Sequence, residues 1–234
     1  MGVVAVGRLN GLSRRKLLAW SVLVALLIAA SYYARYAVAE EDDDSEILYS
    51  YATAVAGLFQ YALMLGFALL IARGTDLRTT FALRRPRSVG RAAWQAAVAL
   101  VAIWVVGAAL SPVLNAGEEQ GFVPEEWEPD KALAFASNAA VVALVGPVVE
   151  ELLFRGLGYT LVGAFYGTAA AIGITAIAFA AAHGLLEGLP ILFAFGVAVA
   201  LLRRATTSIY PSIAVHSIFN AAALAAGVTL GDEL

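Results

Sequence analysis

The ionisable side chains that lie inside apolar stretches are the residues of this chain best suited to chemistry. Glu150 and Glu151 precede Arg155, His183 ends an alanine-rich run, and His216 precedes Asn220 by four residues. His183 and His216 are the only histidines in the sequence. A carboxylate can act as a general base toward water, and imidazole or amide groups can hold that water or stabilise an oxyanion. Together these residue types suit hydrolysis of a carbonyl bond.

Helix geometry separates the two neighbouring glutamates. Adjacent helical positions point about 100° apart, so Glu150 and Glu151 cannot share one role. Glu151 and Arg155 stand at i and i+4 and can pair on one face. Glu150 is therefore the carboxylate that we expect to project into a cavity.

The two histidine motifs also have i, i+4 spacing. Phe179 lies one turn before His183 and would wall the same pocket, while His216 and Asn220 present two hydrogen-bonding groups to one point. Each motif alone also has a structural interpretation, as an interfacial charge cluster or as a hydrogen bond between membrane helices. A charged group in hydrocarbon costs about 2.5–3.5 kcal/mol, however. Their conjunction on three apolar segments therefore favours the functional interpretation.

The elements that must position these groups are membrane helices. Hydrophobic residues make up 61% of the 234 residues and charged residues 14%, and the mean hydropathy is +0.80. Seven apolar runs approach the length of about 20 residues that a membrane helix needs. They are Leu17–Ala39, Leu48–Ala72, Ala92–Leu114, Ala132 to about Arg155, about Gly167–Leu186, Leu189–Leu202 and Tyr210–Leu230. We expect an all-α polytopic transmembrane bundle of about seven helices, with N-terminal helices and charged loops in 1–131 and a catalytic core in 132–230.

The loop charges predict the orientation of this bundle in the lipid bilayer. Basic residues precede the first run (Arg8, Arg14, Arg15, Lys16) and fill the second connection (Arg73, Arg78, Arg84, Arg85, Arg87, Arg91), and Arg203 and Arg204 end the sixth run. Acidic residues fill the alternate loops (Glu40, Glu41, Asp42, Asp43, Asp44; Glu118, Glu119, Glu125, Glu126, Glu128). Because basic loops stay cytoplasmic, we expect a cytoplasmic N-terminus, in a prokaryotic plasma membrane. The net charge of −3 argues against a nucleic-acid partner, and the absence of cysteine excludes disulfides and a thiol nucleophile.

A straight up-and-down bundle would not bring both histidines to Glu150. His183 follows Glu150 by 33 residues, so a helical hairpin that turns near Gly167 would return it to the same depth. His216 lies near the start of the seventh run and would fall in the opposite half of the bilayer. Tilted or shortened helices, or a turn within Glu187–Pro190 that dips into the membrane, would bring it back.

The three motifs together resemble the signature of a known family. Glu150-Glu151-x-x-x-Arg155, Phe179-x-x-x-His183 and His216-x-x-x-Asn220 resemble the motifs of the CPBP family over about residues 135–225. This family comprises type II CAAX prenyl endopeptidases and bacteriocin-processing or immunity proteases of membranes. The resemblance implies that Glu150 is the general base, that His183 holds the water, and that His216 and Asn220 bind it or stabilise the oxyanion. Glu151, Arg155 and Phe179 would be supporting residues.

Several alternatives stay open at this stage. Glu150, His183 and His216 could instead hold a zinc ion, although the helical H-E-x-x-H pattern is absent and we favour a metal-free glutamate mechanism. The substrate would be a membrane-associated protein or peptide, with a prenylated CAAX-type tail or a C-terminal signal as candidates. A non-catalytic scaffold or immunity protein is one alternative function. A proton-coupled transporter is another, although repeated halves and paired broken helices are not evident.

Overall fold

Helices make up all the regular structure of the described residues. The computed structural model describes residues 11–38, 44–110, 112–114 and 127–230, and within these ranges six helical stretches are long and apolar enough to cross a membrane. One of the six reverses its direction at Gly167, so the described part contains seven helical segments, which we call legs. The predicted all-α polytopic bundle is confirmed. Arg8 and most of the predicted acidic loops (Glu40, Glu41, Asp42, Asp43; Glu118, Glu119, Glu125, Glu126) lie outside the described residues.

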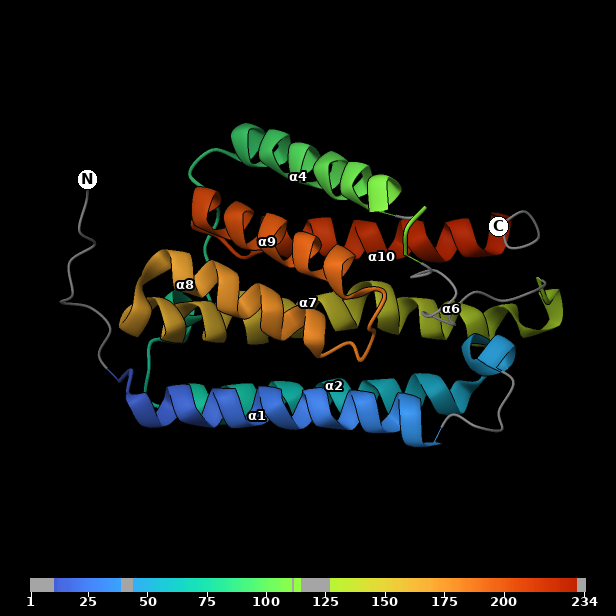
Figure 1. Ribbon diagram of the computed structural model, residues 1–234, viewed down its shortest axis with the longest axis horizontal. Helices are drawn as coiled ribbons and strands as arrows, with labels where there is room; N and C mark the ends of the chain where they lie inside the picture. The colour runs from blue at the N-terminus through green and yellow to red at the C-terminus, as the bar shows by residue number, and fades with distance from the viewer. Residues whose placement is uncertain (1–10, 39–43, 111, 115–126, 231–234) are drawn as a thin grey trace.

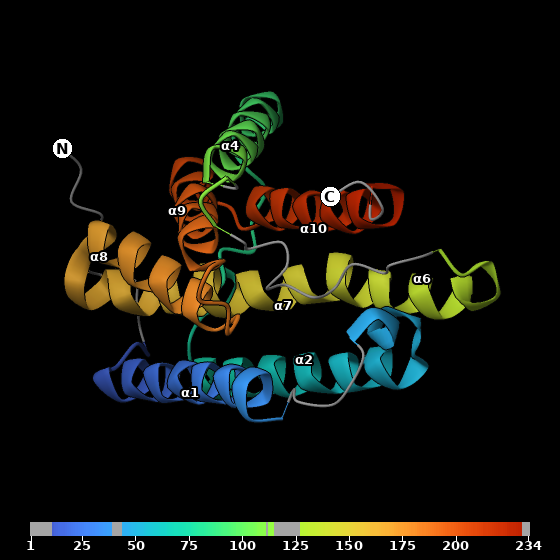
Figure 2. The ribbon, with the colours of Figure 1, turned by 45° about the vertical axis from the view of Figure 1, so that its right-hand side comes forward.

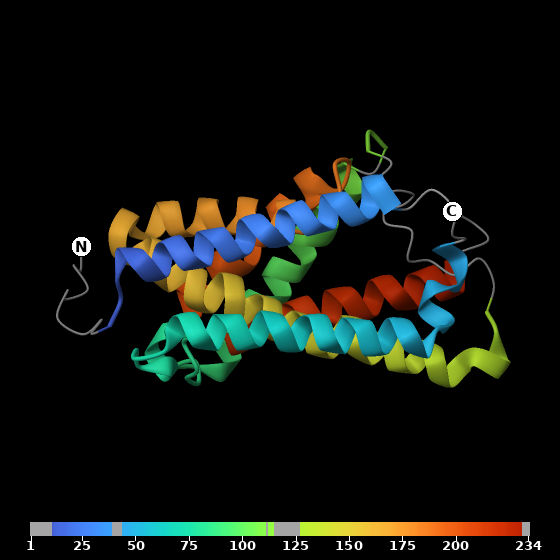
Figure 3. The same ribbon diagram turned by 90° about the horizontal axis from the view of Figure 1, so that it is seen from below.

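Three membrane helices form the N-terminal half. They are α1 (Arg14–Tyr33, extended by a π-helical turn Ala34–Val38), α2 (Tyr51–Ala72, preceded by a 3₁₀ turn Asp44–Tyr49) and α4 (Val89–Leu110), and the short α3 (Leu77–Thr80) lies between α2 and α4. Serine caps begin two of them, because the side chains of Ser13 and Ser50 accept backbone N–H groups of α1 and α2. Figure 3 shows α1 and α2 side by side along one face of the bundle.

The next leg is one long helix with two π-helical interruptions. It runs through η4 (Pro129–Lys131), α6 (Ala132–Ala140), a π segment Val141–Val145, α7 (Gly146–Glu151), a second π segment Leu152–Gly158 and the first part of α8 (Tyr159–Ala181). The helix thus continues beyond Arg155, where the sequence pattern ended it. It reverses at Gly167, whose φ of 83° lies in the left-handed region that glycine adopts without strain.

The last two helices are set at different inclinations. α9 (Leu189–Thr206) starts with Pro190 in its first turn and ends at Thr207, which has a left-handed φ of 54°. α10 (Tyr210–Leu230) follows within a few residues. Figure 2 shows α9 crossing the long helix obliquely, whereas α10 runs alongside it. α4 packs against α9 and α10, on the side opposite to α1 and α2 (Figure 1).

Aromatic rings fill the core where these helices meet. The Phe179 ring lies edge-on to that of Phe154 and stacked on that of Phe195, with both centroid separations 5.5 Å. Trp20 of α1 joins the same core, and its indole N–H donates to the carbonyl of Leu153 at 3.1 Å. The N-terminal helices therefore pack directly on the segment that carries the glutamates. The division of the membrane domain at residue 131 stays a prediction.

Candidate active site

The Glu150 carboxylate faces both histidines of the protein. Its Oε2 atom lies 3.9 Å from Nε2 of His183 and 3.9 Å from Nε2 of His216. Among the described residues this oxygen is buried and has no hydrogen-bond partner. A separation of 3.9 Å is too long for a direct hydrogen bond and is one that a single water can bridge. Groups from three helical legs therefore converge on one point.

The reversal at Gly167 places His183 beside Glu150. Gly167 lies 17 residues after Glu150 and 16 residues before His183, so the two legs of the hairpin are nearly equal in length. The packing of Phe154 against Phe179 across the hairpin keeps the legs in this register. The predicted hairpin and its position are confirmed.

The oblique course of α9 explains how His216 reaches the same depth. The hydroxyl of Ser212, in the first turn of α10, donates to the carbonyl of Val199, in the middle of α9. The first turn of α10 therefore lies beside the centre of α9 and not beside its end. In a straight up-and-down bundle His216 would lie in the half of the bilayer opposite to Glu150. Because α9 is tilted, His216 instead lies 3.9 Å from Glu150.

A buried network surrounds Glu151. Its Oε1 atom lies 3.0 Å from Nη1 of Arg155 and 3.1 Å from Nδ1 of His216. The side chains of Glu151 and Arg155 have no exposed surface, and Arg155 also donates to the carbonyl of Gly196. The pair expected from the i, i+4 spacing is thus formed. Because this carboxylate holds both Arg155 and His216, Glu151 links the first motif to the third.

The Phe179 ring packs against this network. Its ring centroid is 4.5 Å from that of His183 and 5.6 Å from that of His216, and the guanidinium carbon of Arg155 lies 4.2 Å from it. A cation above an aromatic face is favourable, the more so when both are desolvated. Phe179 therefore packs against both histidines and the arginine, and its place in the wall of the substrate pocket stays a prediction.

The hydrogen bonds of the histidines determine which nitrogen faces Glu150. Nδ1 of His183 lies 2.8 Å from the carbonyl of Phe179, and Nδ1 of His216 faces the Glu151 carboxylate. Carbonyl and carboxylate oxygens only accept, so both Nδ1 atoms carry a hydrogen. In neutral rings the Nε2 atoms then present lone pairs. Together with Glu150 they offer three acceptors to the shared point, which suits a donor such as water.

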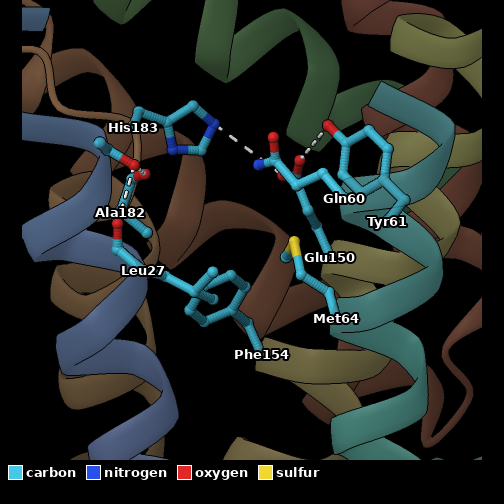
Figure 4. Close-up of a pocket in the computed structure, with 9 residues that line it drawn as sticks. Leu27, Gln60, Tyr61, Met64, Glu150, Phe154, Ala182 and His183 are labelled. Atoms are coloured by element: carbon cyan, nitrogen blue, oxygen red, sulfur yellow. Dashed lines mark hydrogen bonds and ion pairs between the residues drawn. The ribbon is translucent and has the colours of Figure 1, made fainter. Parts of the chain in front are cut away.

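A cavity beside Glu150 includes residues that sequence reasoning missed. It has a volume of about 190 Å³ and is lined by Leu27, Ser31, Gln60, Tyr61, Met64, Glu150, Phe154, Ala182 and His183 (Figure 4). The Tyr61 hydroxyl donates to Oε1 of Glu150 at 2.9 Å. Gln60 and Tyr61 are polar residues in the middle of an otherwise apolar span, and this signal could have identified them.

Comparison with known proteins gives one result for this core. Residues 132–222 match the family model described as type II CAAX prenyl endopeptidase Rce1-like. This match covers 91 of the 234 residues and supports the resemblance of this core to the CPBP family of intramembrane endopeptidases. Comparisons with curated proteins and with solved structures find no significant match. The family is one of membrane proteases, and the matched segment contains all three motifs, whereas Gln60 and Tyr61 lie outside it.

Asn220 has a structural contact in this core. Its amide donates to the carbonyl of Val142 at 2.9 Å. That carbonyl lies in a π segment in which the N–H of Gly146 bonds to Val141. The next N–H along would belong to residue 147, which is a proline and has none. One amide hydrogen of Asn220 therefore replaces the missing backbone donor, and the second hydrogen stays available.

The nitrogen and oxygen atoms of the candidate site match the ligands of zinc in chemical type but not in spacing. Two imidazole nitrogens and a carboxylate oxygen are ordinary zinc ligands, and each histidine donates its other N–H, as metal ligands do. Tetrahedral zinc with bonds of 2.0–2.1 Å would require donor atoms about 3.3 Å apart. The observed separations from Glu150 are both 3.9 Å, and among the described residues no three such side chains are close enough to hold a metal ion. As arranged here, the residues do not fit a zinc ion.

Proposed function

We propose that this protein is an intramembrane endopeptidase in which Glu150 activates a water for attack on a peptide bond. The observation that carries the proposal is the unpartnered Oε2 of Glu150, held at equal distances of 3.9 Å from His183 and His216. A base next to two nitrogen atoms on one buried point is the geometry that water activation needs. The family supports peptide hydrolysis as the chemistry.

The proposed reaction has two steps. First, the water oxygen bonds to the scissile carbonyl carbon while Glu150 takes a water proton, and the carbonyl electrons move to its oxygen. Then the oxyanion collapses, the carbon–nitrogen bond breaks, and Glu150 gives its proton to the leaving amine. The same carboxylate thus acts as base and then as acid, which balances the protons without another group.

Other groups of the site would orient the water and stabilise the charge that develops. His183 is held by the Phe179 carbonyl and presents Nε2 to the water. His216 would accept a hydrogen bond from the water through Nε2, and the second amide hydrogen of Asn220, one turn away on α10, would face the oxyanion. Donors that are already in place stabilise a transition state because they need no reorganisation.

We propose membrane-associated proteins or peptides as substrates. Prenylated CAAX-type tails and C-terminal signals are the two candidate classes, because both place a peptide segment at the membrane. The basic residues that end α9 and fill 73–91 lie at the same end of the bundle as the start of α1 (Figure 1). We therefore propose that this end is cytoplasmic. A prokaryotic plasma membrane stays the predicted location.

Terminal peptide mapping of membranes tests this function. Membranes that contain the wild type, Glu150→Gln or Glu128→Gln are compared for new protein termini. Glu128 lies in a partly exposed pair with Lys131, so its loss should be neutral. We expect cleavages that appear with the wild type and Glu128→Gln and disappear with Glu150→Gln. Termini that do not depend on Glu150 would instead support a non-catalytic scaffold or immunity protein.

A further inference from the structure

The middle of α2 carries two polar residues that a simple membrane anchor would not need. Gln60 and Tyr61 lie near the centre of this 22-residue helix, which is apolar enough to cross a membrane. A polar group placed in an apolar medium without a partner costs several kcal/mol on the strictest scales. Both side chains line the cavity beside Glu150. Their presence therefore points to a role in that cavity.

Tyr61 controls which oxygen of Glu150 is free. Its hydroxyl donates to Oε1 at 2.9 Å, while Oε2 faces His183 and His216. A carboxylate held at one oxygen cannot rotate freely about its terminal torsion, which is otherwise broad. The contact therefore aims the proposed base at the point where the water would lie.

The helix that carries Glu150 has a glycine, Gly146, at the point where the Tyr61 side chain approaches it. A Cβ atom added to Gly146 would lie 2.6 Å from the Tyr61 hydroxyl oxygen and 2.8 Å from its ring carbon Cζ. Such separations are too short, so any larger residue would displace the tyrosine. Gly146 is one turn before Glu150 on the same helix. The absence of a side chain at Gly146 therefore allows Tyr61 of α2 to reach Glu150.

Gln60 faces the same cavity but has no partner among the described contacts. Its side chain is exposed, although it lies in the middle of a membrane helix. Figure 4 shows the amide of Gln60 at the Glu150 end of the cavity, on the side of His183. An amide has both a donor and an acceptor, which is the pair that the backbone of an extended peptide offers.

We propose that α2 forms the second wall of the active site, with Tyr61 as a positioning residue for Glu150 and Gln60 as a binding residue for the substrate backbone. This inference rests on the proposed endopeptidase function. It places part of the active site on an N-terminal helix, which lies outside the residues 132–222 that the family model matches.

Steady-state kinetics separates the two roles. The probe is a quenched fluorogenic peptide that carries a cleavage site found by terminal mapping with the wild type. Tyr61→Phe should lower kcat by roughly 10- to 100-fold with little change in KM, because a misaimed base affects only the chemical step. Gln60→Leu should raise KM by roughly 3- to 10-fold with kcat nearly kept, the effect of one lost hydrogen bond. Tyr51→Phe on α2 and Gln95→Leu on α4 are matched controls that should behave as wild type.

A second substitution, on the other side of the contact between Tyr61 and Glu150, tests whether a loss of activity comes from this contact or from misfolding. Gly146→Ala should displace Tyr61 and lower kcat as Tyr61→Phe does. In a Tyr61→Ala background the added methyl group meets no ring, so Gly146→Ala should then have no further effect. All rates are expressed per folded molecule, from thermal unfolding in detergent.

The outcomes distinguish this inference from the proposed function. If Glu150→Gln abolishes cleavage while Tyr61→Phe keeps its kcat and Gln60→Leu keeps its KM, the role of α2 is wrong and the endopeptidase stands. If Glu150→Gln cleaves normally, both proposals are wrong, because there is then no base for Tyr61 to position.

Discussion

The carboxylate of Glu151 lies 3.0 Å from the guanidinium of Arg155, and neither side chain has any exposed surface. A buried ion pair contributes little net stability over an apolar replacement, but the loss of one partner leaves an uncompensated charge. We therefore expect Glu151→Gln to lower the free energy of unfolding by about 3–5 kcal/mol. Thermal unfolding in detergent measures this.

The same experiment separates the two glutamates. Glu150→Gln should unfold near the wild-type temperature, because a neutral amide is easier to bury than a carboxylate, and cleavage should fall by roughly 10²–10⁴-fold. Glu128→Gln, at a partly exposed pair, should change the free energy by less than about 1 kcal/mol. A stable but inactive Glu151→Gln next to an active Glu150→Gln would identify Glu151 as the base.

Asn220 and Pro147 should be coupled energetically. Asn220→Ala removes the donor to the Val142 carbonyl and should cost about 1–3 kcal/mol of stability. Pro147→Ala supplies a backbone N–H that can bond to the same Val142 carbonyl, so the double variant should be more stable than Asn220→Ala alone. A double-mutant cycle of unfolding temperatures measures the coupling. Additive effects would show that the amide does not replace the missing donor.

Metal dependence gives a separate prediction. With the donor atoms 3.9 Å apart, we expect purified protein to contain less than about one zinc per chain. Peptidase activity should persist in strong chelators. Elemental analysis and a chelator titration measure the two quantities. Activity that chelation removes and stoichiometric zinc restores would instead make Glu150, His183 and His216 metal ligands.

Reporter fusions test the orientation. A fusion after Arg85 should report a cytoplasmic location and one after Glu126 an external location, because the basic and acidic loops alternate. The two sites flank α4, the third membrane span. The same side for both would contradict the crossing of the membrane by α4.

The sequence by itself determined the features that depend on local geometry. Long apolar runs show that the chain crosses a membrane, since hydrocarbon admits few other segments. The i, i+4 spacing predicted that Glu151 pairs with Arg155, because helical periodicity brings those side chains together whatever surrounds them. The 33-residue separation similarly predicted the hairpin that returns His183 to Glu150.

Only the tertiary structure decided the contacts that depend on how helices pack. Tyr61 meets Glu150 across 89 positions because Gly146 admits its ring, and no local pattern records that approach. His216 reaches Glu150 because α9 is tilted, and a tilt follows from interhelical packing and not from the apolar pattern of one segment. The contact of Asn220 with Val142 also depends on packing. Pro147 leaves the Val142 carbonyl without a backbone donor, which the local sequence shows, but the amide that replaces this donor comes from α10 in the packed bundle.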